Sequence, residues 1–277
     1  MIAIGLAIMV VSQAATFAGL EPFASWNTPI AWTGFILFAD GCVYRVRHSS
    51  WIRSAPREFA CLAALSVPLW IVFEGYNLLI ENWYYVGLPE NFWLRQFGFA
   101  WSFATIWPAI FEAAELVGVI RSRRAASVPP QPRHLGILER GAIAAGLAML
   151  ALPFFVPENG VRYLAAPVFL GFVFLLEPVN RFVGAESLSR DRLINLAWAG
   201  LLCGVLWEFW NFWARAKWIY TVPIMQQLKI FEMPLPGYLG FPAFAVECFT
   251  MYVFARAALA RIPPAARLVG PGRAIAL

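Results

Sequence analysis

The feature that most constrains this chain is a series of apolar segments, each close to the length needed to cross a lipid bilayer. The backbone of such a segment satisfies its own hydrogen bonds inside hydrocarbon, so each is expected to be a helix. The 277 residues are 61% apolar and only 13% charged, far from the composition of a soluble domain. The sequence therefore predicts an all-α, polytopic membrane bundle of about eight spans, at residues 2–20, 28–44, 59–80, 99–120, 141–157, 163–183, 194–214 and 238–257.

The basic residues are confined to the short connections between these segments, and they are unevenly divided. If both termini face the cytoplasm, 16 of the 21 Lys and Arg residues fall on the cytoplasmic side, as the positive-inside rule requires. This pattern predicts a multi-pass protein of a bacterial-type inner membrane with both termini cytoplasmic. The formal charge of +5 then reflects membrane topology, and no nucleic-acid partner is predicted.

Two stretches in different halves of the chain share one pattern. Glu74 and Asn77 have the same spacing as Glu208 and Asn211, and a connector rich in Trp and Tyr follows each pair. Corresponding landmarks stay about 134 to 137 residues apart along the chain. A constant offset of this kind is the signature of a tandem repeat.

We therefore predict two four-helix transmembrane repeats, in residues 1–127 and 141–277. A basic, proline-rich cytoplasmic linker at residues 128–140 separates them. Repeats with an even number of spans insert the same way up, so the axis that relates them runs along the membrane normal. A cavity shared by the two repeats is expected at the midline between them.

Carboxylates inside the predicted spans are the first candidates for function, because an ionised carboxylate is costly in hydrocarbon. Each is expected to face the bundle interior, where it finds a donor or serves a functional role. Glu177 lies one helical turn before Arg181, which favours a structural ion pair at the membrane edge. The seven carboxylates are Asp40, Glu74, Glu112, Glu115, Glu177, Glu208 and Glu247.

Taken together, these residues predict an acidic site beneath an aromatic roof. Paired carboxylates can divide acid and base roles, and an amide three residues along the same helix face can donate to a carboxylate or a ligand. The aromatic connectors suit headgroup depth, and we expect a short amphipathic or partly re-entrant segment there. The predicted catalytic residues are Glu74, Glu208, Glu247 and Glu112. The predicted ligand-binding residues are Asn77, Asn211, Trp83, Trp218 and Tyr220.

Metal and cofactor chemistry have no support in the sequence. The four cysteines lie inside apolar runs without close metal-ligand or redox spacing. The two histidines, His48 and His134, lie in basic connections far from the repeated carboxylates. The sequence therefore predicts neither a metal site nor a cofactor.

The repeated motif resembles the small membrane-embedded lycopene cyclases of the heterodimeric type. In that family an acidic residue in an aromatic helix precedes a connector rich in Trp and Tyr, and a proline-led pair of glutamates follows in the next helix. Residues 68–74 followed by 83–85 are similar to the first part, as are 207–208 followed by 218–220. Pro108 with Glu112 and Pro242 with Glu247 are similar to the second part, although the family's adjacent glutamate pair is absent.

This resemblance implies acid-catalysed conversion of a polyene, with glutamates as proton donors. Our leading hypothesis is an intramembrane acidic site that binds an isoprenoid, carotenoid or other lipid and cyclises, isomerises or hydrates it. Two alternatives stay open. One is a non-catalytic subunit of a larger membrane complex, with partner membrane subunits. The other is a transporter coupled to protons or cations, since buried carboxylates also relay protons.

Overall fold

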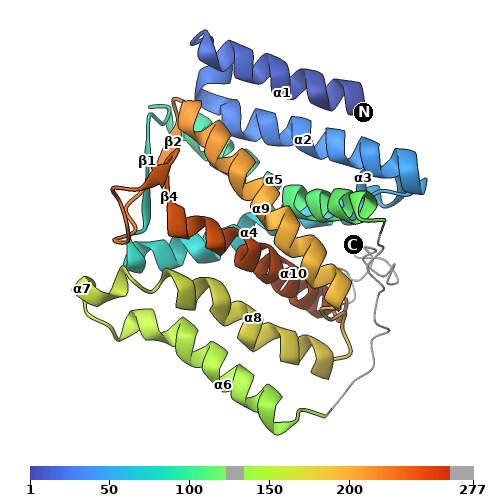
Figure 1. The fold of residues 1–277 in the computed structure, drawn as a ribbon, viewed down its shortest axis with the longest axis vertical. Helices are drawn as coiled ribbons and strands as arrows, with labels where there is room; N and C mark the ends of the chain where they lie inside the picture. Colours follow the sequence, from blue (N-terminus) through green and yellow to red (C-terminus); the bar gives the residue numbers. More distant parts are fainter. Residues whose placement is uncertain (123–133, 263–277) are drawn as a thin grey trace.

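The computed structural model describes residues 1–122 and 134–262, and these fold almost entirely into helices (Figure 1). The helices are α1 (Ile2–Phe17), α2 (Phe23–Arg47), α3 (Trp51–Ser54), α4 (Pro56–Ile80), α5 (Phe92–Ile120), α6 (Ile137–Ala151), η1 (Leu152–Phe154), α7 (Glu158–Val161), α8 (Ala165–Phe182), α9 (Arg190–Trp213), η2 (Leu235–Leu239) and α10 (Gly240–Leu259). The short strands are β1 (Trp83–Val86), β2 (Lys217–Tyr220), β3 (Lys229–Ile230) and β4 (Met233–Pro234).

Six helical segments are long and apolar enough to cross a membrane, so this is a membrane-embedded protein. The helix α1 has only 16 residues. The helix α2 has 25 residues but is less apolar, since it carries Asn27, Thr28 and Asp40. The all-α class is confirmed, and the count of eight spans stays a prediction. The six segments are Pro56–Ile80, Phe92–Ile120, Ile137–Phe154, Ala165–Phe182, Arg190–Trp213 and Leu235–Leu259.

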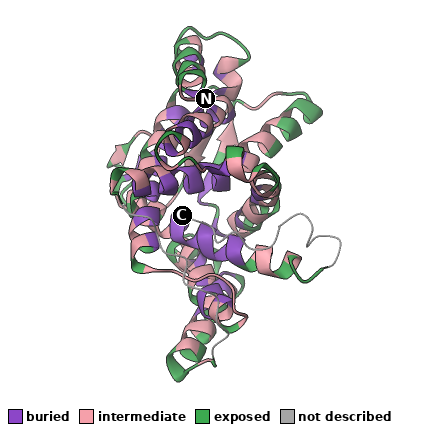
Figure 2. Ribbon diagram, turned by 90° about the vertical axis from the view of Figure 1, so that its right-hand side faces the viewer, coloured by how far each residue is buried: buried purple, intermediate pink, exposed green. Residues whose placement is uncertain are grey.

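The long helices form a central group with a helix pair at each edge (Figure 1). The pair α1 and α2 lies at one edge, the pair α6 and α8 lies at the other, and α4, α5, α9 and α10 lie between them. Within the central group α5 and α10 are the most buried of the six segments, and α4 is as exposed as the edge helix α6 (Figure 2). Apolar side chains on the edge helices face outward, as lipid contact requires: Ile4, Val10, Ile137, Leu138 and Leu147.

In each edge pair the two helices are in close backbone contact at glycine residues. A Cβ atom on Gly5 would lie 2.4 Å from the carbonyl oxygen of Gly34, so α1 and α2 touch backbone to backbone. A Cβ atom on Gly146 would lie 2.7 Å from the carbonyl oxygen of Gly171, which makes the same contact between α6 and α8. Small residues at such interfaces let membrane helices approach closely, where packing replaces the hydrophobic effect as the source of stability.

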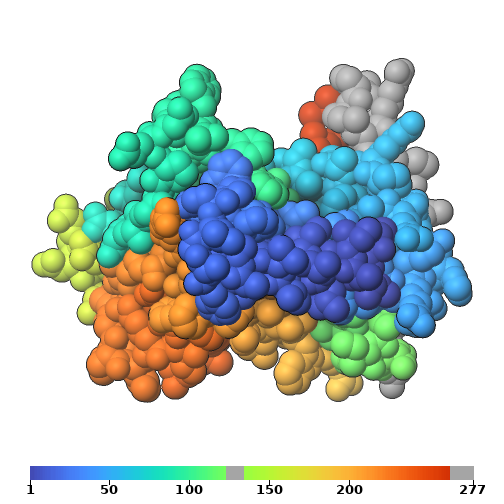
Figure 3. Space-filling model, turned by 90° about the horizontal axis from the view of Figure 1, so that it is seen from above, coloured from blue at the N-terminus to red at the C-terminus, as the bar shows by residue number. Residues whose placement is uncertain are grey.

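The two aromatic connectors pair as β-strands, which the sequence analysis did not predict. β1 and β2 form an antiparallel ribbon in which Trp83 lies opposite Tyr220 and Tyr85 lies opposite Trp218. The amphipathic or partly re-entrant segment expected in these connectors stays a prediction. Residues 83–86 are extended, and their backbone groups find partners in the other connector. Aromatic and β-branched residues favour such pairing. Viewed from above, the teal and orange segments around these strands lie at the same end of the molecule (Figure 3).

We call the end of the bundle that holds β1 and β2 the connector end. Ion pairs lie at both ends of the described helices, and none is found in between. At the connector end they are Arg162 with Glu81, Arg215 with Glu21, and Lys217 with Glu232. At the opposite end they are Arg47 with Glu115, Arg121 with Asp191, Arg181 with Glu177, Arg192 with Glu186, and Arg256 with Glu58. An apolar middle between two charged ends matches a bilayer.

The linker predicted at 128–140 falls partly outside the described residues, since 128–133 are not among them. Its last four residues already belong to α6, which begins at Ile137.

Candidate functional site

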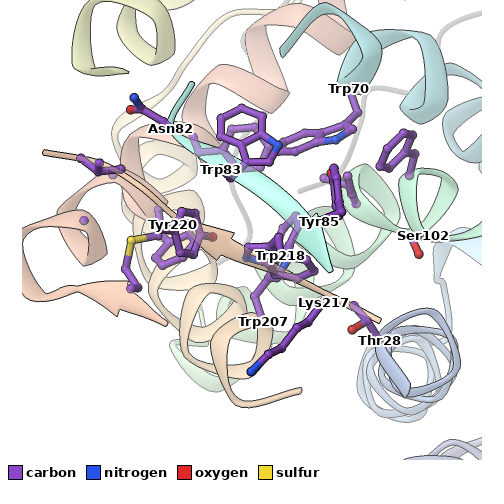
Figure 4. A pocket seen from close by; sticks show the side chains of 18 of the residues that line it. Thr28, Trp70, Asn82, Trp83, Tyr85, Ser102, Trp207, Lys217, Trp218 and Tyr220 are labelled. Carbon is purple, nitrogen blue, oxygen red and sulfur yellow. The ribbon is translucent and has the colours of Figure 1, made fainter. Parts of the chain in front are cut away.

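A cavity of about 430 Å³ lies at the connector end (Figure 4). Its walls come from both halves of the chain: α2, α4, β1 and α5 in the first, and α8, α9, β2 and α10 in the second. Apolar and aromatic side chains form most of the wall, and no carboxylate lies on the part of it that the structure describes. This volume is within the usual range for sites that bind small molecules.

Four tryptophans form a continuous row along the cavity wall (Figure 4). The ring centroids are 5.9 Å apart for Trp83 and Trp70, 6.2 Å for Trp70 and Trp207, and 6.0 Å for Trp207 and Trp218. The ring of Phe244 lies 5.7 Å from that of Trp70. These separations are typical of attractive aromatic pairs. Because the row crosses from the first half of the chain to the second, this wall depends on the packing of both halves.

Glu74 lies directly behind the aromatic wall. Its Oε1 atom accepts hydrogen bonds from the indole Nε1 of Trp70 at 2.7 Å, from the indole Nε1 of Trp83 at 3.3 Å and from the hydroxyl of Tyr85 at 2.6 Å. All three donors belong to side chains that line the cavity. Glu74 is therefore a hydrogen-bond acceptor shared by three side chains of the cavity wall.

Glu208 occupies the corresponding position on α9 but has different surroundings. Its side chain is fully buried, and its Oε1 atom accepts one hydrogen bond, from the hydroxyl of Tyr220 at 3.0 Å. Within the described residues its Oε2 atom has no partner. The two repeated glutamates are therefore not equivalent, since Glu74 is half-buried with three side-chain donors on one oxygen and Glu208 is fully buried with one on its Oε1 atom.

Tyr85 and Tyr220 connect these glutamates to the cavity, because each ring lines the cavity while its hydroxyl donates to a carboxyl group. Burial raises the pKa of each phenol well above its usual value, and the adjacent carboxyl group of Glu74 or Glu208 raises it further. Both hydroxyls therefore keep their protons at neutral pH and act as donors.

The two predicted asparagines hold the backbone of the connectors, where we had expected them to orient the glutamates. The side-chain amide of Asn77 donates to the carbonyl oxygen of Trp83 at 2.8 Å and accepts from the backbone N–H groups of Asn82 and Trp83. The amide of Asn211 makes the same pair of bonds with Trp218, at 2.8 and 2.9 Å. Backbone groups beyond a helix end need partners, and an amide supplies both a donor and an acceptor.

Glu112 and Glu247 are fully buried, but neither lines the cavity. Glu112 lies 20 residues into α5, or about 30 Å from the connector end at the helical rise per residue. Its acidic neighbours are Asp40 and Glu115. Glu247 lies on α10 on the side of Tyr76. The four predicted glutamates therefore do not form one cluster, because α5 carries Glu112 to the opposite end of the bundle.

Asp40 and Glu177 have structural contacts. The Oδ1 atom of Asp40 accepts from the backbone N–H of Ile52 at 2.8 Å, and the Oε1 atom of Glu177 accepts from that of Leu188 at 2.9 Å. The predicted ion pair between Glu177 and Arg181 is confirmed, at 3.0 Å. Both carboxylates therefore tie a connection to the end of a long helix.

Sequence reasoning missed four residues of the site: Trp70, Tyr85, Trp207 and Phe244. Two of these residues could have been predicted from their spacing in the sequence. Trp70 precedes Glu74 by one helical turn and so shares its face. Tyr85 lies at the repeat offset from Tyr220, which was predicted. For Phe244 the sequence holds no comparable signal, since its contacts depend on how α10 packs.

Among the described residues, no group of three or more His, Cys, Asp or Glu side chains is placed to hold a metal ion. The four cysteines, all within the described residues, are free thiols. The fold and the cavity define a multi-pass α-helical membrane protein with an aromatic-walled cavity at one end. Comparison with models of protein families, with curated proteins and with solved structures finds no match to this chain.

Proposed function

We propose that this chain binds a long unsaturated lipid, an isoprenoid or carotenoid-type polyene, in the aromatic-walled cavity. The observation that carries the proposal is the row formed by Trp83, Trp70, Trp207 and Trp218. Flat, polarisable double bonds pack well against aromatic faces, and a bilayer supplies such ligands directly. A cavity of about 430 Å³ accommodates a substantial part of an isoprenoid chain.

The test is polyene binding by the purified protein in lipid nanodiscs, followed by quenching of tryptophan fluorescence. Trp207→Ala is expected to weaken binding about tenfold, because it removes the centre of the row. Trp198→Ala is the matched control, since Trp198 lies on the same helix but is exposed and does not line the cavity. Equal effects of the two substitutions would refute the proposal.

Acid–base conversion of the bound lipid is a second candidate function, favoured by the hydrogen bonds of Tyr85 and Tyr220 to the glutamates behind the wall. In this scheme Glu208 supplies a proton through Tyr220, and the π electrons of a double bond form the new C–H bond. Loss of a proton from the neighbouring carbon, toward Glu74, regenerates a double bond, so that the product is an isomer. The tryptophan faces would stabilise the intervening cation.

Incubation with a polyene in D2O tests this scheme, since each turnover replaces a hydrogen of the lipid with deuterium. Glu208→Gln is expected to abolish deuterium uptake while polyene binding persists. Glu112→Gln is the control, because that glutamate is also buried but does not line the cavity. Persistent uptake in Glu208→Gln would remove Glu208 from the mechanism. If native extracts hold only phospholipid and partner chains at a fixed ratio, the assembly-subunit alternative is favoured.

We also infer that the chain consists of two four-helix units, with eight spans in all, related by an axis along the membrane normal. The ribbon supports this, because it joins corresponding segments of the two halves. Trp83 and Tyr85 of β1 lie at the repeat offset from Trp218 and Tyr220 of β2. An axis that relates the two halves would bring such corresponding segments together.

Matched contacts elsewhere support the same inference. In each half a carboxylate near the end of a helix accepts from a backbone N–H of the next connection, and in each half a glycine pair joins the edge helices. The carboxylate pairs are Asp40 with Ile52 and Glu177 with Leu188. The glycine pairs are Gly5 with Gly34 and Gly146 with Gly171.

Reporter fusions test the topology, in which the connector end is the outer end and both termini are cytoplasmic. A reporter active only outside the cytoplasm is expected to be active in the connections at 81–91 and 214–234. It is expected to be inactive at 48–55, the basic connection between α2 and α4. Reporter activity at 48–55 would contradict the proposed eight-span topology.

A further inference from the structure

We propose that the ligand of this cavity is a single-tailed amphiphile whose anionic oxygen headgroup is bound by Arg95. This inference rests on the proposed lipid-binding function and narrows its ligand class. The lipids that fit are isoprenyl phosphates and isoprenoid or fatty acid anions, which combine an apolar tail with oxygen acceptors at one end.

The charges on the cavity wall are the first observation. Three cations line the cavity, Arg95, Arg162 and Lys217, and the described wall carries no carboxylate. Arg162 is paired with Glu81 outside the wall, and Lys217 is paired with Glu232 at 2.8 Å. Within the described part of the chain no carboxylate pairs with Arg95. A guanidinium group presents several N–H donors in a fork that matches the oxygens of a carboxylate or phosphate.

The position of Arg95 on its helix gives the ligand a direction. Arg95, Phe99, Ser102 and Ile106 all line the cavity, and their spacing places them on one face of α5. Arg95 is the first of the four, close to the start of the helix at the connector end. A ligand along this face therefore has its charged group at the membrane edge and its tail toward the apolar interior.

Polar atoms without partners are a second, independent observation. The Oγ1 atom of Thr28 is buried, has no hydrogen-bond partner among the described residues, and belongs to a side chain that lines the cavity. Thr28 is only 7% exposed. Its hydroxyl can donate. The Oδ1 atom of Asn82, on the side of the cavity away from Thr28 in Figure 4, is an acceptor without a partner among the same residues.

These atoms distinguish an oxygen-bearing ligand from a pure hydrocarbon. A hydrocarbon would leave the buried hydroxyl of Thr28 without a partner, which is unfavourable, and would offer nothing to the guanidinium group of Arg95. An oxyanion headgroup supplies several acceptors at once. The acceptor at Asn82 would be met by a water molecule or by a hydroxyl group farther along the ligand.

The experiment compares two ligands that differ only in their headgroup, geranylgeranyl phosphate and geranylgeraniol, in nanodiscs of zwitterionic lipid. The phosphate is expected to bind about 10 to 100 times more tightly, the range expected for hydrogen bonds to charged groups. Arg95→Gln is expected to reduce this preference to less than about threefold while the alcohol binds as before. Arg140→Gln is the control, since Arg140 is exposed on α6 and the cavity is remote.

The outcomes separate this inference from the proposed function. Equal binding of phosphate and alcohol, or an unchanged preference in Arg95→Gln, overturns the headgroup site but leaves lipid binding intact. Failure of both ligands to bind overturns lipid binding as well. Geranylgeranoic acid identifies the headgroup: binding as tight as that of the phosphate supports a general oxyanion site, and weaker binding supports a phosphate site. Displacement of the phosphate ligand by inorganic phosphate supports a site that recognises the headgroup alone.

Discussion

Glu74 and Glu208 show how two residues at corresponding positions acquire different chemistry. One oxygen of Glu74 accepts from two indoles and a phenol. Glu208 accepts from one phenol and keeps a buried oxygen without a partner in the described structure. One reason is that Trp70 lies one turn before Glu74 and donates to it, whereas the corresponding position one turn before Glu208 is Gly204, which has no side-chain donor. Paired carboxylates with unlike surroundings are the usual basis for separate acid and base roles.

Substitution by glutamine should separate the two glutamates. Glu74→Gln is expected to lower the free energy of unfolding by about 1.5 to 3 kcal/mol, because it perturbs a group that accepts three side-chain hydrogen bonds. Glu208→Gln is expected to lower the free energy of unfolding by less than about 1 kcal/mol. A neutral amide of the same shape replaces a carboxyl group that accepts only one side-chain hydrogen bond, from Tyr220. Thermal unfolding in detergent measures both. A larger loss for Glu208→Gln would contradict the assignment.

The phenols of Tyr85 and Tyr220 predict a loss of stability at high pH. Burial and the adjacent carboxyl groups raise the pKa of both in the folded protein above the ordinary value of 10. The folded state therefore binds these protons more tightly than the unfolded state does. The contribution of the two phenols to the free energy of unfolding is complete below about pH 10, and it is lost as the pH rises through the folded pKa values.

Unfolding temperatures measured between about pH 9 and 11 check this expectation. The wild type should lose stability with rising pH more steeply than the Tyr85→Phe, Tyr220→Phe double variant. Tyr163→Phe is the control, because Tyr163 is exposed and should leave the slope unchanged. Identical slopes for the wild type and the double variant would show that the two phenols do not contribute.

At the scale of elements, helix contacts depend on a few small residues. The approach of α6 to α8 requires Gly146, where an added Cβ would lie 2.5 Å from the backbone nitrogen of Leu175. Gly141, on the same helix, has no atom within 4 Å of the position that a Cβ would take. The two glycines therefore differ only in what faces them.

Alanine substitution at these glycines gives a matched pair. Gly146→Ala is expected to destabilise the protein by about 1 to 3 kcal/mol, because neighbouring backbone must shift. Gly141→Ala should be neutral or stabilising by up to about 1 kcal/mol, since alanine is the better helix former. Unfolding in detergent measures the difference, and equal destabilisation by the two substitutions would show that the close approach is not required.

At the scale of the molecule, the cavity belongs to neither half alone. The ribbon of β1 and β2, the contact of α5 with α9, and the step from Trp70 to Trp207 in the tryptophan row all join the first half of the chain to the second. A ligand in the cavity would touch both halves, so its binding is expected to depend on how they are held together.

A cysteine pair tests the register of the ribbon. Tyr84 and Ile219 lie opposite each other, so Tyr84→Cys with Ile219→Cys is expected to form a disulfide in a background without the four native cysteines. After cleavage at a protease site introduced between α5 and α6, the two fragments should stay linked until reduced. Val86→Cys with Ile219→Cys, displaced by two residues, is the control and should link far less. Equal linking by both pairs would contradict the register.

The sequence alone determined what depends on local chemistry. Apolar length and backbone hydrogen bonding predicted the long helices, and spacing on one helix predicted the ion pair of Glu177 with Arg181. The repeated spacing also pointed to Glu74, Glu208, Trp83, Trp218 and Tyr220, which the structure places in or behind one aromatic wall.

Only the tertiary structure decided which residues from distant segments meet. It paired the connectors as strands, used Asn77 and Asn211 to hold backbone, and placed Glu112 at the opposite end of the bundle from Glu74. The physical reason is that a helix face and a span length are properties of neighbouring residues. The partner of a side chain, by contrast, depends on how helices from both halves pack and on which unpaired backbone groups lie within reach.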